Sequence, residues 1–122
     1  MTSMNNPSAS AVHEDPHQAL QIAQAVMGNR TKSMIVRHLW THGDSTGSSI
    51  CAETGISGPT FSLAMQQLER WQITSGSIPS HQRHGRAVTY SLDQTKIRGL
   101  VQLWFDFVQG QIPGESEAPE GS

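Results

Sequence analysis

The sequence contains a single cysteine and no long apolar segment, and these two absences exclude several classes of protein. Cys51 has no second cysteine to pair with in the 122 residues, so the fold cannot depend on an internal disulfide. No stretch is apolar over the roughly 20 residues that a transmembrane helix needs, and the N-terminus shows no basic and then apolar leader. We therefore expect a cytoplasmic protein that does not enter the membrane.

Charged residues are also scarce, at 15% of the chain, and the formal net charge is −2. This total gives no general attraction to nucleic acid, but the charge is unevenly distributed. All eight Lys and Arg residues lie between Arg30 and Arg98, and between Pro16 and Ile112 they face only five acidic residues, a balance of +3. The central region is therefore compatible with DNA binding, although its charge alone does not predict it.

The two ends of the chain differ in composition from its centre. Residues 1–14 and 113–122 are mostly small or polar and offer little apolar surface to bury. We expect a disordered N-terminal tail over 1–14 and a disordered acidic C-terminal tail over 113–122. The remaining residues, 15–112, suffice for one domain.

Apolar residues recur at helical spacing in four consecutive segments, and residues that favour helix termini mark their boundaries. Thr46 or a neighbouring Ser begins the third of these segments. We predict helices between the following residues: Asp15 and Gly28, Asn29 and Gly43, Thr46 and Gly55, and Ser57 and Arg70.

The apolar period changes after the fourth helix. Residues 73–78 are strand-like, residues 79–85 form a polar turn, and apolar residues then alternate with polar ones up to Leu92. We predict a two-stranded hairpin with a basic tip, followed by a helix over Thr95–Gln109 that Asp93 caps. The fold class is mainly α with a small β-hairpin (α+β).

Residues 48–68 meet the requirements of a helix-turn-helix. Cys51 supplies a small residue where two helices cross, and Gly55, four positions later, can adopt the positive φ that the turn needs. Ile56 is an apolar plug, and the second helix has an inner face that begins at Phe61 and includes Met65 and Leu68. With the hairpin and the last helix, the order of elements predicts a winged helix-turn-helix.

Three segments, Met27–Leu39, Thr54–Ser62 and Gly85–Leu92, resemble the ArsR-like (arsenical-resistance-repressor type) family of bacterial transcriptional regulators. The resemblance covers about residues 19–107. It implies a dimer whose fourth helix enters the major groove of DNA while the hairpin wing reaches the backbone or the minor groove. Many members of the family leave DNA in response to a metal or another signal.

The sequence departs from this family within the fourth helix. Leu63 and Ala64 stand where basic residues or His are usual. Trp71 and Gln72 stand where a small residue and glycine commonly close the recognition helix. These departures concern the mode of base contact more than the fold.

The outward face of the fourth helix carries candidate DNA contacts. Gln66 could pair with an adenine edge, Thr60 or Ser62 could contact bases or phosphate, and Leu63 could touch a thymine methyl. The alternative is a solvated polar face with Leu63 packed on a neighbour. The predicted DNA-binding residues of this segment are Ser57, Gly58, Thr60, Ser62, Leu63, Gln66, Gln67 and Arg70.

Basic residues elsewhere are candidate phosphate contacts. The hairpin tip holds the densest cluster, His81, Arg83, His84 and Arg86, whose alternative is an ordinary exposed turn. If either histidine binds phosphate, DNA affinity should rise as the pH falls toward ~6.5. The start of the second helix adds two further candidates, which could equally be solvated surface residues: Arg30 and Lys32.

The last helix has more apolar surface than one small core needs. Together with the first helix it predicts a homodimer interface, the alternative being a helix buried on all sides in a monomer. The predicted interface residues are Leu20, Ile22, Val26, Leu100, Val101, Trp104, Phe105 and Val108.

We expect no cofactor, no metal site and no enzymatic activity. Cys51 is best interpreted as a small buried hydrophobe, and His13 and His17 have no acidic or thiol partner nearby. The sequence shows no nucleophile–base pair and no phosphate-binding glycine loop. We predict a dimeric repressor that recognises an inverted-repeat operator in double-stranded DNA. The alternative is a winged-helix module that binds another regulatory protein.

Overall fold

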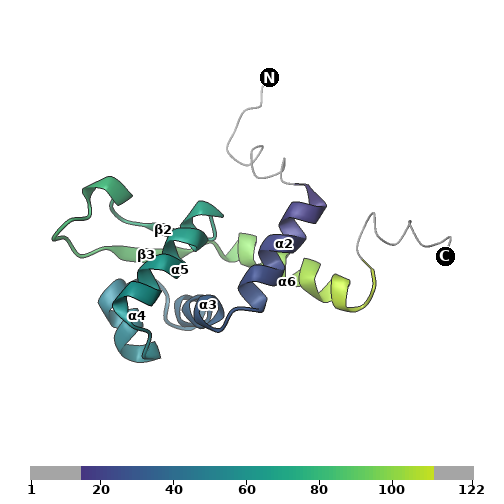
Figure 1. The fold of residues 1–122 in the computed structure, drawn as a ribbon, viewed down its shortest axis with the longest axis horizontal. Coiled ribbons are helices and arrows are strands. Elements are labelled where there is room, and N and C mark those ends of the chain that lie inside the picture. The colour runs from purple at the N-terminus through teal and green to yellow at the C-terminus, as the bar shows by residue number, and fades with distance from the viewer. Residues whose placement is uncertain (1–14, 112–122) are drawn as a thin grey trace, which may run out of the picture.

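The computed structural model describes residues 15–111, which form five α-helices, a short 3₁₀ helix and a small antiparallel sheet (Figure 1). The predicted order of helices and hairpin strands is confirmed. The predicted tails, with His13, lie outside the described residues. The elements are α2 Pro16–Met27, α3 Arg30–His42, β1 Ser45–Thr46, α4 Gly47–Thr54, α5 Gly58–Arg70, β2 Thr74–Gly76, η2 Ser80–Gln82, β3 Thr89–Leu92 and α6 Gln94–Val108.

Each of these α-helices begins directly after a residue whose side-chain oxygen accepts a backbone N–H of the first turn. Such a bond satisfies one of the N–H groups that a helix start leaves without an intrahelical partner. The bonds accepted by Asp15, Asn29 and Asp93 are the shortest, at 2.7, 2.8 and 2.9 Å. Thr46 and Ser57 cap α4 and α5 in the same way.

The bend between α4 and α5 is confirmed as a helix-turn-helix turn. Gly55 has φ 77° and ψ 9°, in the left-handed region, and its N–H donates to the Cys51 carbonyl at 2.8 Å. Ile56 follows and packs against the core, after which Ser57 caps α5. Because glycine adopts this conformation without steric cost, the chain can reverse within three residues.

The sheet has three strands rather than the predicted two, in the order β1-β3-β2. The additional strand, β1, pairs Ser45 with Tyr90 and Thr46 with Thr89. A two-residue polar strand has no alternating pattern, so sequence periodicity could not reveal it. On the other side of β3, β2 forms the expected hairpin over fewer residues than predicted.

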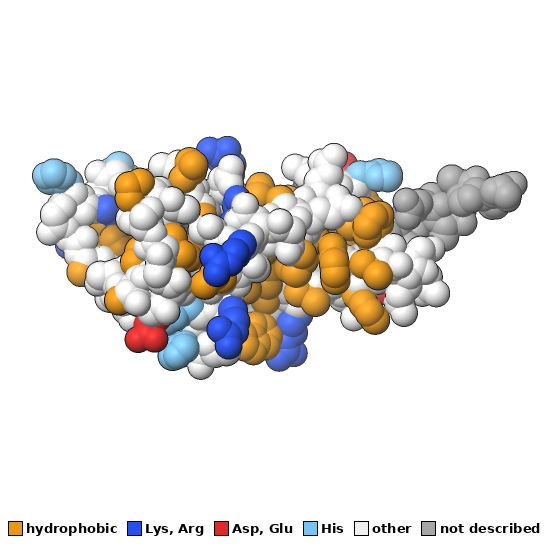
Figure 2. All heavy atoms as spheres, turned by 60° about the horizontal axis from the view of Figure 1, so that its bottom comes forward, with side chains coloured by type: hydrophobic (Ala, Val, Ile, Leu, Met, Phe, Trp, Pro, Cys, Tyr) orange, Lys and Arg blue, Asp and Glu red, His pale blue; other side chains and the backbone are white. Residues whose placement is uncertain are grey.

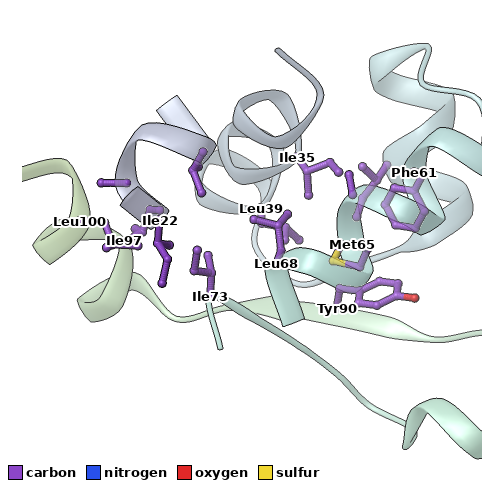
Figure 3. Packing of buried hydrophobic residues seen from close by; sticks show 14 of the residues in the cluster. Ile22, Ile35, Leu39, Phe61, Met65, Leu68, Ile73, Tyr90, Ile97 and Leu100 are labelled. Atoms are coloured by element: carbon purple, nitrogen blue, oxygen red, sulfur yellow. The ribbon is translucent and has the colours of Figure 1, made fainter. Parts of the chain in front are cut away.

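A continuous apolar core joins the five helices and β3 (Figure 3). At one end Ile22, Ile97 and Leu100 pack between α2 and α6. At the other end Phe61 of α5 meets Tyr90 of β3 edge to face, with ring centroids 5.7 Å apart. The core therefore fixes α5 against the sheet that carries the wing.

The molecule is elongated, with the paired helices α2 and α6 at one end and the hairpin loop at the other (Figure 1). We call the loop between β2 and β3, residues 77–88, the wing. Within residues 15–111 no helix is long and apolar enough to cross a bilayer.

Candidate nucleic-acid interface

The helix α5 has one buried and one exposed face. Buried residues recur at helical spacing and place the opposite face in solvent. Leu63 is 64% exposed, so its side chain does not pack on a neighbour within the described chain. The other outward residues are largely polar and uncharged. The buried face consists of Phe61, Ala64, Met65 and Leu68, and the exposed candidates are Ser57, Gly58, Thr60, Ser62, Leu63, Gln66 and Arg70.

Two candidates of α5 are placed less openly than the others. Gln67 is half-buried beside the core face. The hydroxyl of Thr60 accepts a hydrogen bond from the Ser57 hydroxyl at 2.9 Å, although its side chain remains exposed. Ser62 and Gln66 lie nearer the middle of the exposed face and line the hollow beside the wing.

The wing presents three exposed basic or titratable side chains, those of His81, His84 and Arg86. The short helix η2 and a turn at Gly85, with φ 68°, shape its tip. Arg86 also lines a hollow of about 270 Å³ with Thr46 and residues at the start of α4. The positive end of a helix dipole and a guanidinium thus lie on one surface, which suits an anionic partner.

Arg83, a predicted phosphate contact of the wing tip, makes three hydrogen bonds within the chain. Its two terminal nitrogens donate to the two carboxylate oxygens of Glu69, at 3.1 and 2.8 Å, and its Nε donates to the Ile78 carbonyl at 2.8 Å. The hydrogen bonds with Glu69 raise the pKa of Arg83 further above its ordinary value. Arg83 and Glu69 are 14 residues apart, so no helical or strand spacing in the sequence could predict that they pair.

The two basic residues at the start of α3 differ in their surroundings. Arg30, the first residue of the helix, is exposed. Lys32 is half-buried, and its Nζ lies 6.0 Å from the centroid of the Trp71 ring, just beyond the end of α5. Both residues stay candidates for phosphate contact, with Lys32 the closer of the two to the recognition helix.

The predicted dimer interface divides into buried and exposed residues. Leu20, Ile22, Val26 and Leu100 are at most 9% exposed, because α2 and α6 pack these side chains against each other and the core. The chain itself thus covers these four side chains, and their assignment to an interface between two chains stays a prediction. The exposed members are Val101, Phe105 and Val108, at 43, 48 and 58%, whereas Trp104 is half-buried.

Two exposed aromatic residues are not among the predicted interface residues. Phe107 of α6 is 36% exposed, and Trp40 of α3 is 40% exposed beneath the guanidinium of Arg98. Figure 2 shows hydrophobic side chains gathered over the end of the molecule that α2 and α6 form, while most Lys and Arg side chains lie nearer its middle. On this face, the apolar end of the molecule at α2 and α6 is distinct from a more basic middle.

The described residues include one thiol, that of Cys51. Partial burial raises the pKa of the Cys51 thiol, which keeps the thiol protonated at neutral pH. Cys51 packs against the core, as expected of a small hydrophobe. Among residues 15–111, no three His, Cys, Asp or Glu side chains lie close enough together to hold a metal ion.

These elements define a winged helix-turn-helix: a bent helix pair, a basic hairpin beside its second helix, and a closing helix. No protein-family model and no curated protein matches the chain. The solved structure of an ArsR family transcriptional regulator, RHA00566, is similar at a TM-score of 0.59 and 17% identity, covering 76% of this chain and 89% of that one.

Two further solved structures share the fold over nearly the whole chain. The transcriptional regulator PA4135 has a TM-score of 0.53 and 14% identity, covering 99% of this chain and 88% of its own. MepR, a transcription regulator of the Staphylococcus aureus multidrug efflux pump MepA, has a TM-score of 0.51 and 17% identity, covering 98% and 87%. At these identities the likeness shows the fold, a winged helix-turn-helix, as the sequence predicts.

Proposed function

We propose that this protein is a sequence-specific regulator of transcription that binds double-stranded DNA as a homodimer. The observation that carries the proposal is the exposed outer face of α5 beside a wing with exposed His81, His84 and Arg86. The major groove of B-DNA admits one α-helix, and a cationic hairpin beside that helix can reach the flanking phosphates. The solved structures that share the fold are those of transcriptional regulators, which supports a role in transcription.

The two elements would divide the contacts with DNA. Ser62, Leu63 and Gln66 have the chemistry to contact base edges, and Arg86 and the start of α4 have the chemistry to hold phosphates. The polar recognition face suggests that sequence is selected by few hydrogen bonds and one apolar contact. Phosphate contacts would then supply most of the affinity and make it depend on salt.

The apolar end of the molecule is where we place the dimer interface. Val101, Phe105 and Val108 lie at helical spacing on α6 and leave large apolar surfaces exposed. A twofold axis there would set two α5 helices to contact half-sites about one helical turn apart, ~34–36 Å. Repression follows where such an operator overlaps a promoter, because the dimer and the polymerase then compete for the same duplex.

The test is selection of bound duplexes from a random pool, followed by fluorescence anisotropy at several salt concentrations. We expect an inverted repeat to be enriched and its binding to resist nonspecific competitor. Arg86→Ala should lower the slope of log affinity against log salt by about one. The matched control is Arg98→Gln, which removes a cation of α6 that lies over Trp40. Light scattering first verifies that this variant assembles as the wild type does.

A second candidate function is binding to another regulatory protein. The 64% exposure of Leu63 at the centre of an uncharged helix face favours it, because such a surface also suits an apolar partner. The selection experiment separates the two functions. If no sequence is enriched, and if the weak binding that is seen disappears with nonspecific competitor, sequence-specific DNA recognition is overturned. Binding to another regulatory protein is then the function that remains.

A further inference from the structure

We infer that Arg83 is a positioning residue that, with Glu69, holds the wing at a fixed distance from the recognition helix, and that it is not itself a contact to DNA. The inference rests on the proposed function for its consequence, but its structural part stands on contacts within the chain. The sequence predicts that Arg83 contacts phosphate, and the inference gives it a different role.

The guanidinium of Arg83 makes three hydrogen bonds to two partners. Both terminal nitrogens bond to Glu69 of α5, and Nε bonds to the carbonyl of Ile78, where the chain enters the wing. The side chains of the pair are only 22% and 20% exposed, so solvent screens this ion pair less than an exposed one. A bidentate pair also fixes orientation, because the planar fork of arginine matches the two carboxylate oxygens.

The strand β2 is shaped to admit this side chain. A Cβ at Gly76 would overlap Nη2 of Arg83 and would lie 3.0 Å from a methyl group of Val88. The guanidinium also lies 5.5 Å from the centroid of the ring of Tyr90, the residue paired with Gly76 on β3. Glycine within a strand often marks the close approach of another group, and here that group is Arg83.

The pair lies between the two elements proposed to contact DNA. Ser62, Gln66 and Glu69 of α5, with Ser80 and Arg83 of the wing, line a hollow of about 310 Å³. A duplex that both elements contact requires a set spacing between them. A wing held at that spacing before binding avoids the ordering cost that a loose loop would incur on the DNA.

The decisive variant is Glu69→Gln, because the two roles of Arg83 predict opposite changes. If the pair positions the wing, affinity for the selected operator falls about threefold to tenfold. If Arg83 contacts phosphate, the variant frees a cation and removes an anion near the duplex, so affinity rises and the salt slope steepens. The latter result would overturn the inference. Asp44→Asn, which removes an exposed carboxylate that is not part of the wing or of α5, is the matched control.

A conservative variant gives a second readout. Arg83→Lys keeps the positive charge but cannot make the bidentate bond and the bond to Ile78 together. We expect it to lose affinity as Glu69→Gln does. Near wild-type affinity in Arg83→Lys would indicate that charge alone matters, and would contradict a positioning role.

A measurement without DNA separates failure of this inference from failure of the proposed function. The Arg86 N–H donates to the Arg83 carbonyl, and the Gln82 N–H to the Pro79 carbonyl, each at 2.9 Å. In Glu69→Gln these wing amides should exchange with solvent faster, while the amide of Ile97 in α6 should not change. Unchanged exchange in the wing would overturn the inference even if the wild-type protein binds DNA as proposed.

Discussion

The imidazole rings of His38 and His42 stack one helical turn apart on α3, with centroids 4.4 Å apart and planes 17° from parallel. His38 is 5% exposed, whereas His42 faces solvent and its Nδ1 lies 3.2 Å from the His38 carbonyl oxygen. Burial lowers the pKa of His38, and the neighbouring His42 lowers it further, while Glu53 of α4 acts in the opposite direction. Over the pH range between this lowered pKa and the ordinary one, His38 is therefore neutral in the native state and protonated in the unfolded chain.

We predict that this protein loses stability as the pH falls below about 6.5, the ordinary pKa of His. In that range the unfolded state binds more protons than the native state, so the free energy of unfolding decreases with decreasing pH. Urea midpoints at pH 7.5 and 5.5 measure the effect. The decrease should be smaller in His38→Gln and unchanged in His81→Gln, which removes an exposed imidazole. An equal decrease in all three proteins would assign it to other groups.

A residue just beyond the end of α5 has a strained backbone conformation, and a substitution can remove that strain. Gln72 has φ 61°, the sole positive φ of a non-glycine residue between residues 15 and 111, while the Ile73 N–H donates to the Leu68 carbonyl at 2.9 Å. This bond is typical of a helix terminus at which glycine is preferred. We predict that Gln72→Gly stabilises the protein by about 0.5–1 kcal/mol, measured by urea unfolding.

The matched control for this variant is the same change inside a helix. Gln21→Gly, at an exposed interior position of α2, should destabilise the protein by about 1 kcal/mol. If the same change from Gln to Gly raises the free energy of unfolding at residue 72 and lowers it at residue 21, backbone conformation is the cause. Equal losses in both variants would mean that the Gln72 side chain makes a contribution larger than the strain.

Features set by neighbouring residues were predictable from the sequence, and features set by tertiary contacts were not. Asp15, Ser57 and Asp93 cap helices through bonds that span three residues, so short patterns identified them. The pair of Glu69 and Arg83 forms only after the wing has folded back. Gly76 within a predicted strand was the one local sign that another group approaches there.

The sequence also could not predict which apolar residues of the last helix are buried within the chain and which are exposed. An apolar residue such as Leu100 or Val101 has the same sequence signature whether its own chain or a second chain covers it. The packing of α2 on α6 buries Leu100 and leaves Val101 exposed. Helical periodicity gave the correct elements but could not divide their faces between the core and an interface.

Base contact by α5 predicts a specific signature for Gln66, whose side chain is exposed and lines the hollow beside the wing. Gln66→Ala should reduce discrimination at one position of each half-site by about 1–3 kcal/mol, because a bidentate bond to a base edge is lost. The salt slope should not change, since no charge is removed. Competition between operators that differ at single positions measures the effect. A uniform loss of affinity over all sequences would show that Gln66 does not contact a base.

The division of α6 into buried and exposed faces predicts that two substitutions on one helix have different effects. Phe105→Glu places a charge on the exposed apolar face and should weaken the proposed dimer about tenfold or more while the monomer keeps its helical content. Leu100→Ala leaves a cavity in the core and should cost about 2–5 kcal/mol of unfolding free energy. Sedimentation equilibrium, circular dichroism and urea unfolding separate the two effects, with Gln94→Glu at the exposed start of α6 as the charge control. Because a buried residue cannot contact a second copy, a change at Leu100 that dissociated the dimer without destabilising the fold would contradict this assignment of faces.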